Sequence, residues 1–167
     1  MNSRAAIQFS FMVMLYLLIQ ILVLRNIVFF NYAFCFIYVG GVLILPAEVS
    51  RMYLLFIGFA TGFMVDVFSN TFGMHAAATV LIAYVRPYLM EYQMESRGME
   101  RVEVGIRAQG FAHFLGYIFP LIFLHHAVLF LMEMNNFGMI LPTLLRIIAS
   151  AIFTTVMIVL IELFSKR

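Results

Sequence analysis

A run of 20 residues near the start of the chain, Ala5 to Leu24, contains no Lys, Arg, Asp or Glu. An α-helix rises about 1.5 Å per residue, so a run of this length is what a helix needs to cross the hydrocarbon core of a bilayer, about 30 Å thick. The whole chain has this character, since 65% of its 167 residues are hydrophobic and 11% are charged. Soluble domains carry about 25% charged residues. The sequence therefore predicts an integral membrane protein with a single domain.

A secretory signal peptide is the alternative interpretation of this first run, because Arg4 precedes it. The apolar part of a signal peptide has about 7–15 residues and is followed by a small-residue cleavage site. Here the run is longer and is followed by Arg25 and Asn26. We therefore expect a retained first transmembrane span.

Five further apolar segments follow the first. None alternates between apolar and polar residues as the strands of a membrane barrel do, and only helices satisfy every backbone group within lipid without closing a barrel. The predicted fold class is therefore an all-α integral membrane protein with six transmembrane helices. The predicted spans are 5–24, 27–45, 52–68, 72–86, 108–132 and 139–164, with a cytoplasmic loop at 87–107.

The basic residues predict the orientation. Six spans put both termini on one side, and eight of the ten Lys and Arg residues then share that side, whereas only Arg25 lies on the other and Arg146 falls inside the sixth span. Because basic residues accumulate in cytoplasmic loops, we expect both termini in the cytoplasm. The eight are Arg4, Arg51, Arg86, Arg97, Arg101, Arg107, Lys166 and Arg167.

The predicted loop at 87–107 is the only sizeable segment outside the spans. Its mixed charges, including an opposite-charge pair at Glu103 and Arg107, are typical of a surface helix or a solvated linker. A docking surface for a cytoplasmic partner is the alternative, because Tyr92 and Met99 give the loop apolar content.

Several classes of function are disfavoured by composition and motif. A net charge of +2 is too small to suggest nucleic-acid binding, and the single cysteine, Cys35, excludes an intrachain disulfide. Neither a Gly-x-Ser-x-Gly motif nor a phosphate-binding Gly-rich loop occurs, so we expect neither an enzyme nor a cofactor. Adjacent His125 and His126 lack the i, i+4 spacing of helical zinc motifs, so we expect no metal site.

Polar residues gather in one place within the apolar sequence. Asp66, Ser69, Asn70 and His75 all fall within ten residues, at the junction of the third and fourth predicted spans. The two spans are short, and a tight hairpin must join them, for which Ser69, Asn70 and Gly73 supply turn and cap residues. An aspartate within lipid costs about 2.5–3.5 kcal/mol on insertion scales, so Asp66 needs a partner.

Arg146 is the partner that the sequence suggests for Asp66. Helical rise places Asp66 roughly 22 Å above the cytoplasmic face and Arg146 roughly 10 Å below the outer surface, at similar depths. We expect the pair to clamp two helices together, with His75, His125 and His126 in the same half of the bilayer. A proton relay or anion site is one alternative, and two side chains that reach toward water without meeting is the other.

Gly58 and Gly62 form a Gly-xxx-Gly pair on the third predicted span. Small residues at this spacing let two helix backbones approach closely. We therefore expect this face of the helix to pack against a neighbouring helix.

The hairpin from Gly58 to Tyr84 resembles the signature of the bacterial rod shape-determining protein MreD family. The matching residues include the aspartate, the serine and the glycine of the turn, and an Ala-Tyr pair that ends the following apolar run. They are Asp66, Ser69, Gly73, His75, Ala83 and Tyr84.

This resemblance implies a non-enzymatic component of the inner membrane that scaffolds the cell-elongation machinery and regulates cell shape. The implied partners are an MreC-like protein, an MreB-like filament and the synthases of lateral peptidoglycan. Self-association into a homo-oligomer is a further alternative. It also implies similarity in fold to the S-components of energy-coupling-factor transporters. The alternative function is therefore a small-solute-binding S-component with a site near Asp66, His75 and Arg146. We expect a small or apolar cavity there rather than a ligand pocket.

Overall fold

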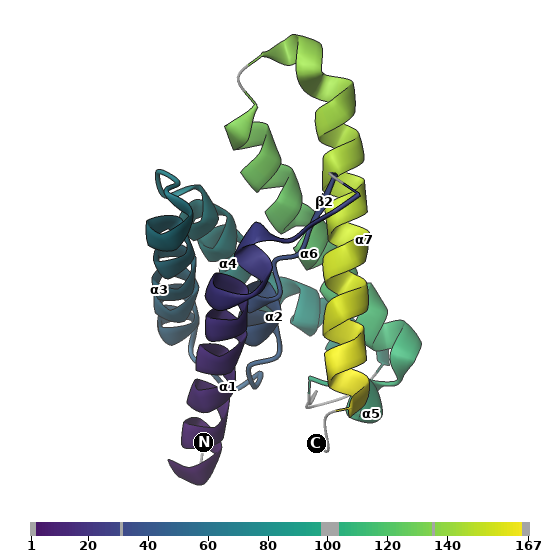
Figure 1. The fold of residues 1–167 in the computed structure, drawn as a ribbon. Coiled ribbons are helices and arrows are strands. Elements are labelled where there is room, and N and C mark those ends of the chain that lie inside the picture. The colour runs from purple at the N-terminus through teal and green to yellow at the C-terminus, as the bar shows by residue number, and fades with distance from the viewer. Residues whose placement is uncertain (1–2, 31, 98–103, 135, 165–167) are drawn as a thin grey trace.

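The fold of this chain is mostly helical, as Figure 1 shows for a computed structural model that describes residues 3–30, 32–97, 104–134 and 136–164. The helices are α1 Ser3–Leu22, α2 Tyr38–Leu43, α3 Arg51–Ser69, α4 Met74–Arg97, α5 Ile106–Gln109, α6 Phe111–Glu133 and α7 Ile140–Phe164, with single turns of 3-10 helix at η1 Leu24–Asn26 and η2 Phe137–Met139. A hairpin of two-residue strands, β1 Val28–Phe29 and β2 Ala33–Phe34, lies between η1 and α2.

Among the described residues, three stretches of helix are long and apolar enough to cross a membrane. They are α3, α6 and Phe137–Phe164, which joins η2 to α7, with mean hydropathies of 1.7, 2.0 and 2.4. The first helix adds a shorter apolar stretch at Ile7–Leu22. The chain is therefore a mostly helical protein with membrane-spanning helices, in agreement with the predicted class at that level.

The second predicted span, 27–45, is not a continuous helix, and the prediction of one was wrong. This segment holds the β1–β2 hairpin and then α2, which has only six residues. Side chains of α7 satisfy its extended backbone, because the N–H groups of Phe34 and Phe36 donate to the hydroxyls of Ser150 (2.9 Å) and Thr154 (3.1 Å). Irregular backbone is tolerated at membrane depth where protein buries it in this way.

The fourth predicted span, 72–86, ends earlier than the corresponding helix does. Helix α4 continues through Pro87 to Arg97, so the first half of the predicted loop 87–107 is helical. Within this half Glu91 is exposed and pairs with Arg51 at 3.1 Å, which fits the surface helix among the two interpretations. Met99, Arg101 and Glu103 lie outside the described residues, as do Lys166 and Arg167.

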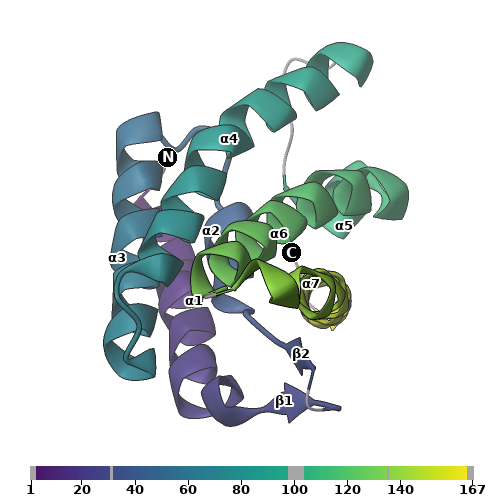
Figure 2. The ribbon, with the colours of Figure 1, turned by 90° about the horizontal axis from the view of Figure 1, so that it is seen from above.

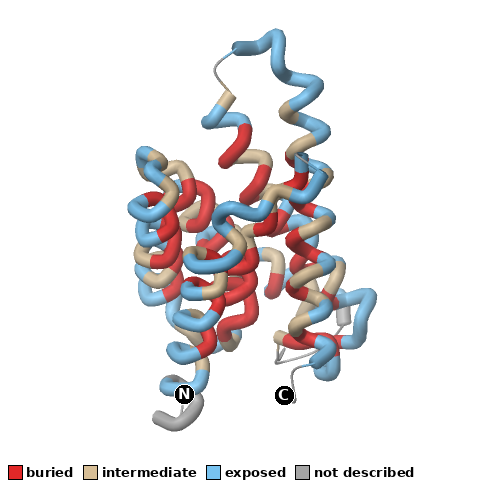
Figure 3. Tube along the Cα trace, in the orientation of Figure 1, coloured by how far each residue is buried: buried red, intermediate tan, exposed pale blue. Residues whose placement is uncertain are grey.

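Helices α3 and α4 form an antiparallel hairpin at one edge of the molecule, with α1 beside it and α6 and α7 on the other side of α4 (Figures 1 and 2). The start of α1 and the end of α7 lie at the same end (Figure 1). Buried residues follow the faces along which these helices meet (Figure 3). The end of α6 and the start of α7, where the two helices are joined, are exposed.

Glycine sets the closeness of the α3–α4 contact. A methyl group built on Gly62 would lie 2.6 Å from the Cα atom of Ala76, and one on Gly58 would lie 3.1 Å from the Cβ atom of Ala83. The first distance is shorter than a carbon–carbon contact allows, so only glycine fits at residue 62. The Gly-xxx-Gly pair thus faces α4, its partner in the hairpin.

Candidate functional site

The Asp66 side chain connects the end of α3 to the start of α4. Its Oδ1 atom accepts a hydrogen bond from the backbone N–H of His75 (3.1 Å), and its Oδ2 atom accepts one from that of Ala76 (2.8 Å). The first N–H groups of a helix have no partner within the helix, and the positive end of the helix dipole lies there. The buried carboxylate therefore caps α4 from the preceding helix.

Two side chains complete the surroundings of this carboxylate. The Thr71 hydroxyl donates to Oδ1 at 2.5 Å, and the His75 Nδ1 atom lies 3.1 Å from the same oxygen. Asp66 and His75 are 3% and 5% exposed, so burial and short contacts together fix the rotamers of both. Asp66 thus finds its partners within the hairpin.

The turn between the two helices has the backbone that its residues favour. Asn70 ends α3 in the left-handed region, with φ 56°, and its N–H donates to the Asp66 carbonyl. Gly73 takes φ 80° before α4 begins. Ser69 is half-buried beside them, and the Arg25 guanidinium donates to the Phe68 carbonyl at 2.6 Å. Asn70 and Gly73 are therefore the residues of the motif that shape the turn.

Arg146 does not pair with Asp66 in this structure, and the predicted clamp is corrected accordingly. Its guanidinium lies 3.7 Å from the Glu133 carboxylate and over the rings of Phe34 and Phe130, at 5.4 and 5.6 Å from their centroids. The depth argument assumed straight, untilted spans with a surface at each end. Instead, α6 and α7 reach beyond the α3–α4 turn (Figure 1), so equal counts of residues do not give equal depths.

A second buried polar cluster joins four elements at the centre of the bundle. The Tyr38 hydroxyl lies 3.0 Å from Thr79 Oγ1 and 2.8 Å from His125 Nε2. His126 Nε2 lies 3.2 Å from Thr154 Oγ1, which also binds the backbone beside β2. The histidines therefore hold helices together. Sequence analysis missed Tyr38, Thr79 and Thr154. A pattern that indicates part of this cluster is the spacing of Ser150 and Thr154, which lie four residues apart and so share one face of an apolar helix.

Arg86 is the largest departure from the predicted surface positions. It is only 1% exposed, and its guanidinium donates to the Leu43 carbonyl (3.2 Å), the Leu45 carbonyl and the Tyr117 hydroxyl (2.8 Å). The carbonyl groups at the end of α2 have no partner within that helix, and the negative end of its dipole favours a cation. Arg86 therefore caps α2, and its predicted role in a cytoplasmic surface was wrong.

A cavity of about 390 Å³ lies beside the α3–α4 turn, where Thr71 and His75 are among the residues that line it. Aromatic rings line it together with charged and polar groups, so the expectation of a small or apolar cavity near Asp66 was wrong. The His75 Nε2 atom is buried and has no hydrogen-bond partner among the described residues. Residues lining the cavity include Arg25, Asn26, Phe34, Phe36, Phe68, Thr71, His75 and Glu133.

The described histidines and carboxylates do not gather as metal ligands. Within the described part of the chain, no group of three or more His, Cys, Asp or Glu side chains has the geometry to hold a metal ion. Asp66 is already bound to two backbone N–H groups, and the His125 Nε2 atom faces a tyrosine hydroxyl. The arrangement supports helix capping and helix packing as the work of these residues.

No protein-family model, no curated protein and no solved structure matches this chain. The resemblance to the MreD family therefore depends on the residues of the α3–α4 hairpin, and on them alone.

Proposed function

We propose that this protein is a non-enzymatic scaffold of the bacterial inner membrane, a component of the cell-elongation machinery like the MreD family that its hairpin resembles. One observation carries the proposal: both oxygens of the Asp66 carboxylate bind backbone N–H groups at the start of α4. A carboxylate used in this way gives a hairpin of fixed shape rather than a reactive or ligand-binding group. The cluster of polar residues around Asp66 then serves recognition by shape.

The tip of the hairpin is the surface that a partner would recognise. Phe72 is fully exposed there, between Asn70 and Gly73, which set the backbone of the turn. An exposed phenyl ring on a rigid turn is a typical anchor for a partner protein, because aromatic anchors dominate binding energies and a preformed turn has little entropy to lose. The partner proposed is an MreC-like protein on the outer side of the membrane, with an MreB-like filament and peptidoglycan synthases completing the assembly.

The topology proposed with this function has six crossings and both termini in the cytoplasm. The chain runs alternately toward the two ends of the molecule (Figure 1), with the β1–β2 hairpin and α2 together forming the second pass. Removing buried Arg86 from the eight basic residues assigned to the cytoplasmic side leaves seven against Arg25, which still favours this orientation.

Complementation of cell shape tests the proposal. In a strain without this gene, Phe72→Ala should leave protein level and thermal unfolding unchanged, while it lowers co-purification of the MreC-like protein severalfold and gives rounded cells. Phe111→Ala provides the matched control, because Phe111 is an exposed phenylalanine at the start of α6 and not in the hairpin. Normal shape and normal co-purification in the Phe72→Ala strain would contradict the proposed recognition surface.

A small-solute-binding S-component is the second candidate, and the cavity of about 390 Å³ beside His75 favours it. This volume falls within the range of small-molecule pockets, about 300–1,000 Å³. Mass spectrometry of the purified protein separates the two candidates. A vitamin-like molecule that co-purifies with the wild type and is lost in His75→Ala would favour the S-component over the scaffold.

A further inference from the structure

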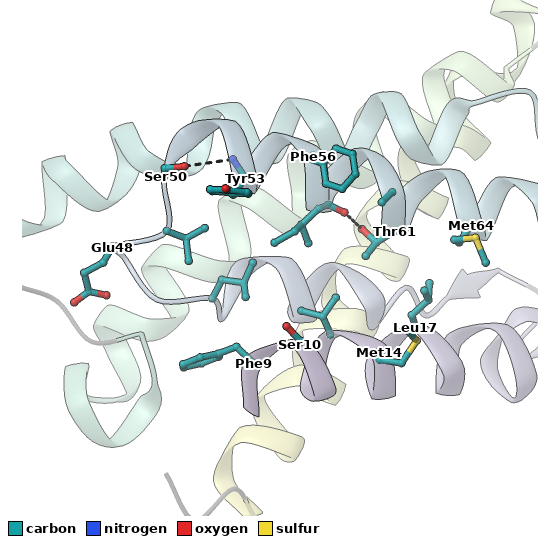
Figure 4. Close-up of a pocket in the computed structure, with 15 residues that line it drawn as sticks. Phe9, Ser10, Met14, Leu17, Glu48, Ser50, Tyr53, Phe56, Thr61 and Met64 are labelled. Atoms are coloured by element: carbon teal, nitrogen blue, oxygen red, sulfur yellow. Dashed lines mark hydrogen bonds between the residues drawn. The ribbon is translucent and has the colours of Figure 1, made fainter. Parts of the chain in front are cut away.

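A groove of about 750 Å³ separates α1 from α3 at the edge of the molecule (Figure 4). Its walls are mainly apolar, and the Thr61 hydroxyl among them already donates to the Ile57 carbonyl of its own helix at 2.8 Å. Apolar walls favour an apolar occupant over water. The side chains on its walls include Phe9, Val13, Met14 and Leu17 of α1 and Tyr53, Phe56, Ala60 and Met64 of α3.

The length of the groove limits what can fill it. Its wall on α3 runs from Tyr53 to Met64, roughly 16 Å of helix, and its wall on α1 runs from Phe9 to Leu17, roughly 12 Å. The hydrocarbon core is about 30 Å thick, so the groove spans one leaflet. A transmembrane helix of a partner would need a groove along the whole thickness, whereas an acyl chain from one leaflet needs only this half.

A carboxylate stands at the end of the groove. Glu48 is exposed in the loop before α3, and Figure 4 places it and Ser50 at one end of the apolar walls. Among the described residues, the Glu48 carboxylate has no hydrogen bond and no ion pair. The nearby cation in sequence, Arg51, is already engaged with Glu91 at 3.1 Å and lies over the Tyr88 ring. The end of the groove therefore offers negative charge.

We propose that this groove binds one phospholipid with a primary ammonium headgroup, such as phosphatidylethanolamine. The acyl chain lies between α1 and α3, and the ammonium group donates hydrogen bonds to the Glu48 carboxylate. A primary ammonium carries three N–H donors, as the lysine ammonium does. The quaternary ammonium of phosphatidylcholine has none, and the glycerol headgroup of an anionic lipid lacks the positive charge. This site is independent of the scaffold function proposed above.

Quenching by brominated lipids tests the site directly, because the chain contains no tryptophan. Phe56→Trp places one fluorophore in the groove of the full-length protein, and Leu160→Trp, at an exposed position in the last two turns of α7, provides the control. Each variant is reconstituted in phosphatidylcholine vesicles, and phosphatidylethanolamine or phosphatidylcholine with brominated chains is added as a minor component.

Brominated phosphatidylethanolamine should quench Phe56→Trp with about threefold to fivefold higher apparent affinity than brominated phosphatidylcholine, while Leu160→Trp reports equal quenching by both. Adding Glu48→Gln to Phe56→Trp should abolish the preference, and adding Glu95→Gln, which removes an exposed charge from α4, should preserve it. Equal quenching of Phe56→Trp by the two lipids would overturn the proposed site. A preference that survives Glu48→Gln would overturn the assigned role of Glu48.

Discussion

The Asp66 carboxylate, in the last turn of α3, accepts the backbone N–H of Ala76 in the first turn of α4 at 2.8 Å. This contact crosses the hairpin rather than linking it to a distant helix. The cap thus joins the end of α3 to the start of α4 and thereby fixes the angle of the turn between them. An acidic residue at this depth is explained by the local structure of the hairpin.

Asp66→Asn should destabilise the protein by about 1–3 kcal/mol. Asparagine keeps one acceptor oxygen, but its amide nitrogen cannot accept the second backbone N–H, and a buried donor is then left without a partner. Thermal unfolding in detergent measures the effect. Ser69→Ala is the control from the same turn, because the Ser69 hydroxyl makes no hydrogen bond with any described residue, and this variant should unfold as the wild type does.

Asp66→Asn and Arg146→Gln should have additive effects on stability. The two side chains have separate partners, since Arg146 contacts Glu133 and two phenyl rings. Mutations without shared partners usually add to within about 0.3–0.5 kcal/mol. A double-mutant cycle in detergent unfolding measures the coupling, and a value of 1 kcal/mol or more would mean that the ion pair predicted from the sequence forms after all.

Gly62→Ala should destabilise the hairpin by about 1–3 kcal/mol, as overpacking commonly does. The new methyl group would meet the backbone of α4 at 2.6 Å, and backbone cannot move aside as a flexible side chain can. Gly116→Ala in α6 is the matched control, because its methyl group would meet only the Gln93 side chain, at 3.8 Å. Helix propensity alone favours alanine over glycine and would raise both unfolding temperatures. An unfolding temperature of Gly62→Ala that rises as much as that of Gly116→Ala would therefore contradict the packing argument.

Arg86→Met should be among the most damaging single substitutions in this chain, with a loss of about 3 kcal/mol or more. It leaves the Leu45 carbonyl and the Tyr117 hydroxyl oxygen buried without their donor, while the Leu43 carbonyl keeps only the hydrogen bond from the Tyr117 hydroxyl (2.7 Å). Arg51→Met removes an arginine from an exposed ion pair, for which we expect at most about 1 kcal/mol. Protein yield and unfolding in detergent compare the two, and equal losses would contradict the capping role of Arg86.

Local features of the sequence predicted local features of the structure. Helices α3, α6 and α7 begin and end within three residues of the predicted spans, because long apolar runs bounded by polar residues decide helix length in a bilayer. Asn70 and Gly73 likewise mark the turn, because few residues take a left-handed backbone at low cost.

The predictions failed where a distant part of the chain decides the structure. The apolar segment 27–45 carries no sign in its own residues that Ser150 and Thr154 of α7 satisfy its extended backbone. Arg86 follows an apolar run, and only the position of α2 shows that its guanidinium is needed inside. The pairing of Asp66 with Arg146 failed because residue counting along straight helices ignores how far each helix reaches.

Site-directed photocrosslinking tests the central claim, that the capped α3–α4 hairpin presents its tip to a partner protein. A photoreactive amino acid at Phe72, which is fully exposed, is compared in living cells with one at Phe111, exposed at the opposite end of the molecule. We predict a crosslink from residue 72 to the MreC-like protein that is lost when Asp66→Asn is added, and none from residue 111. Residue 72 crosslinking only to lipid, with full cell-shape complementation retained, would contradict the account.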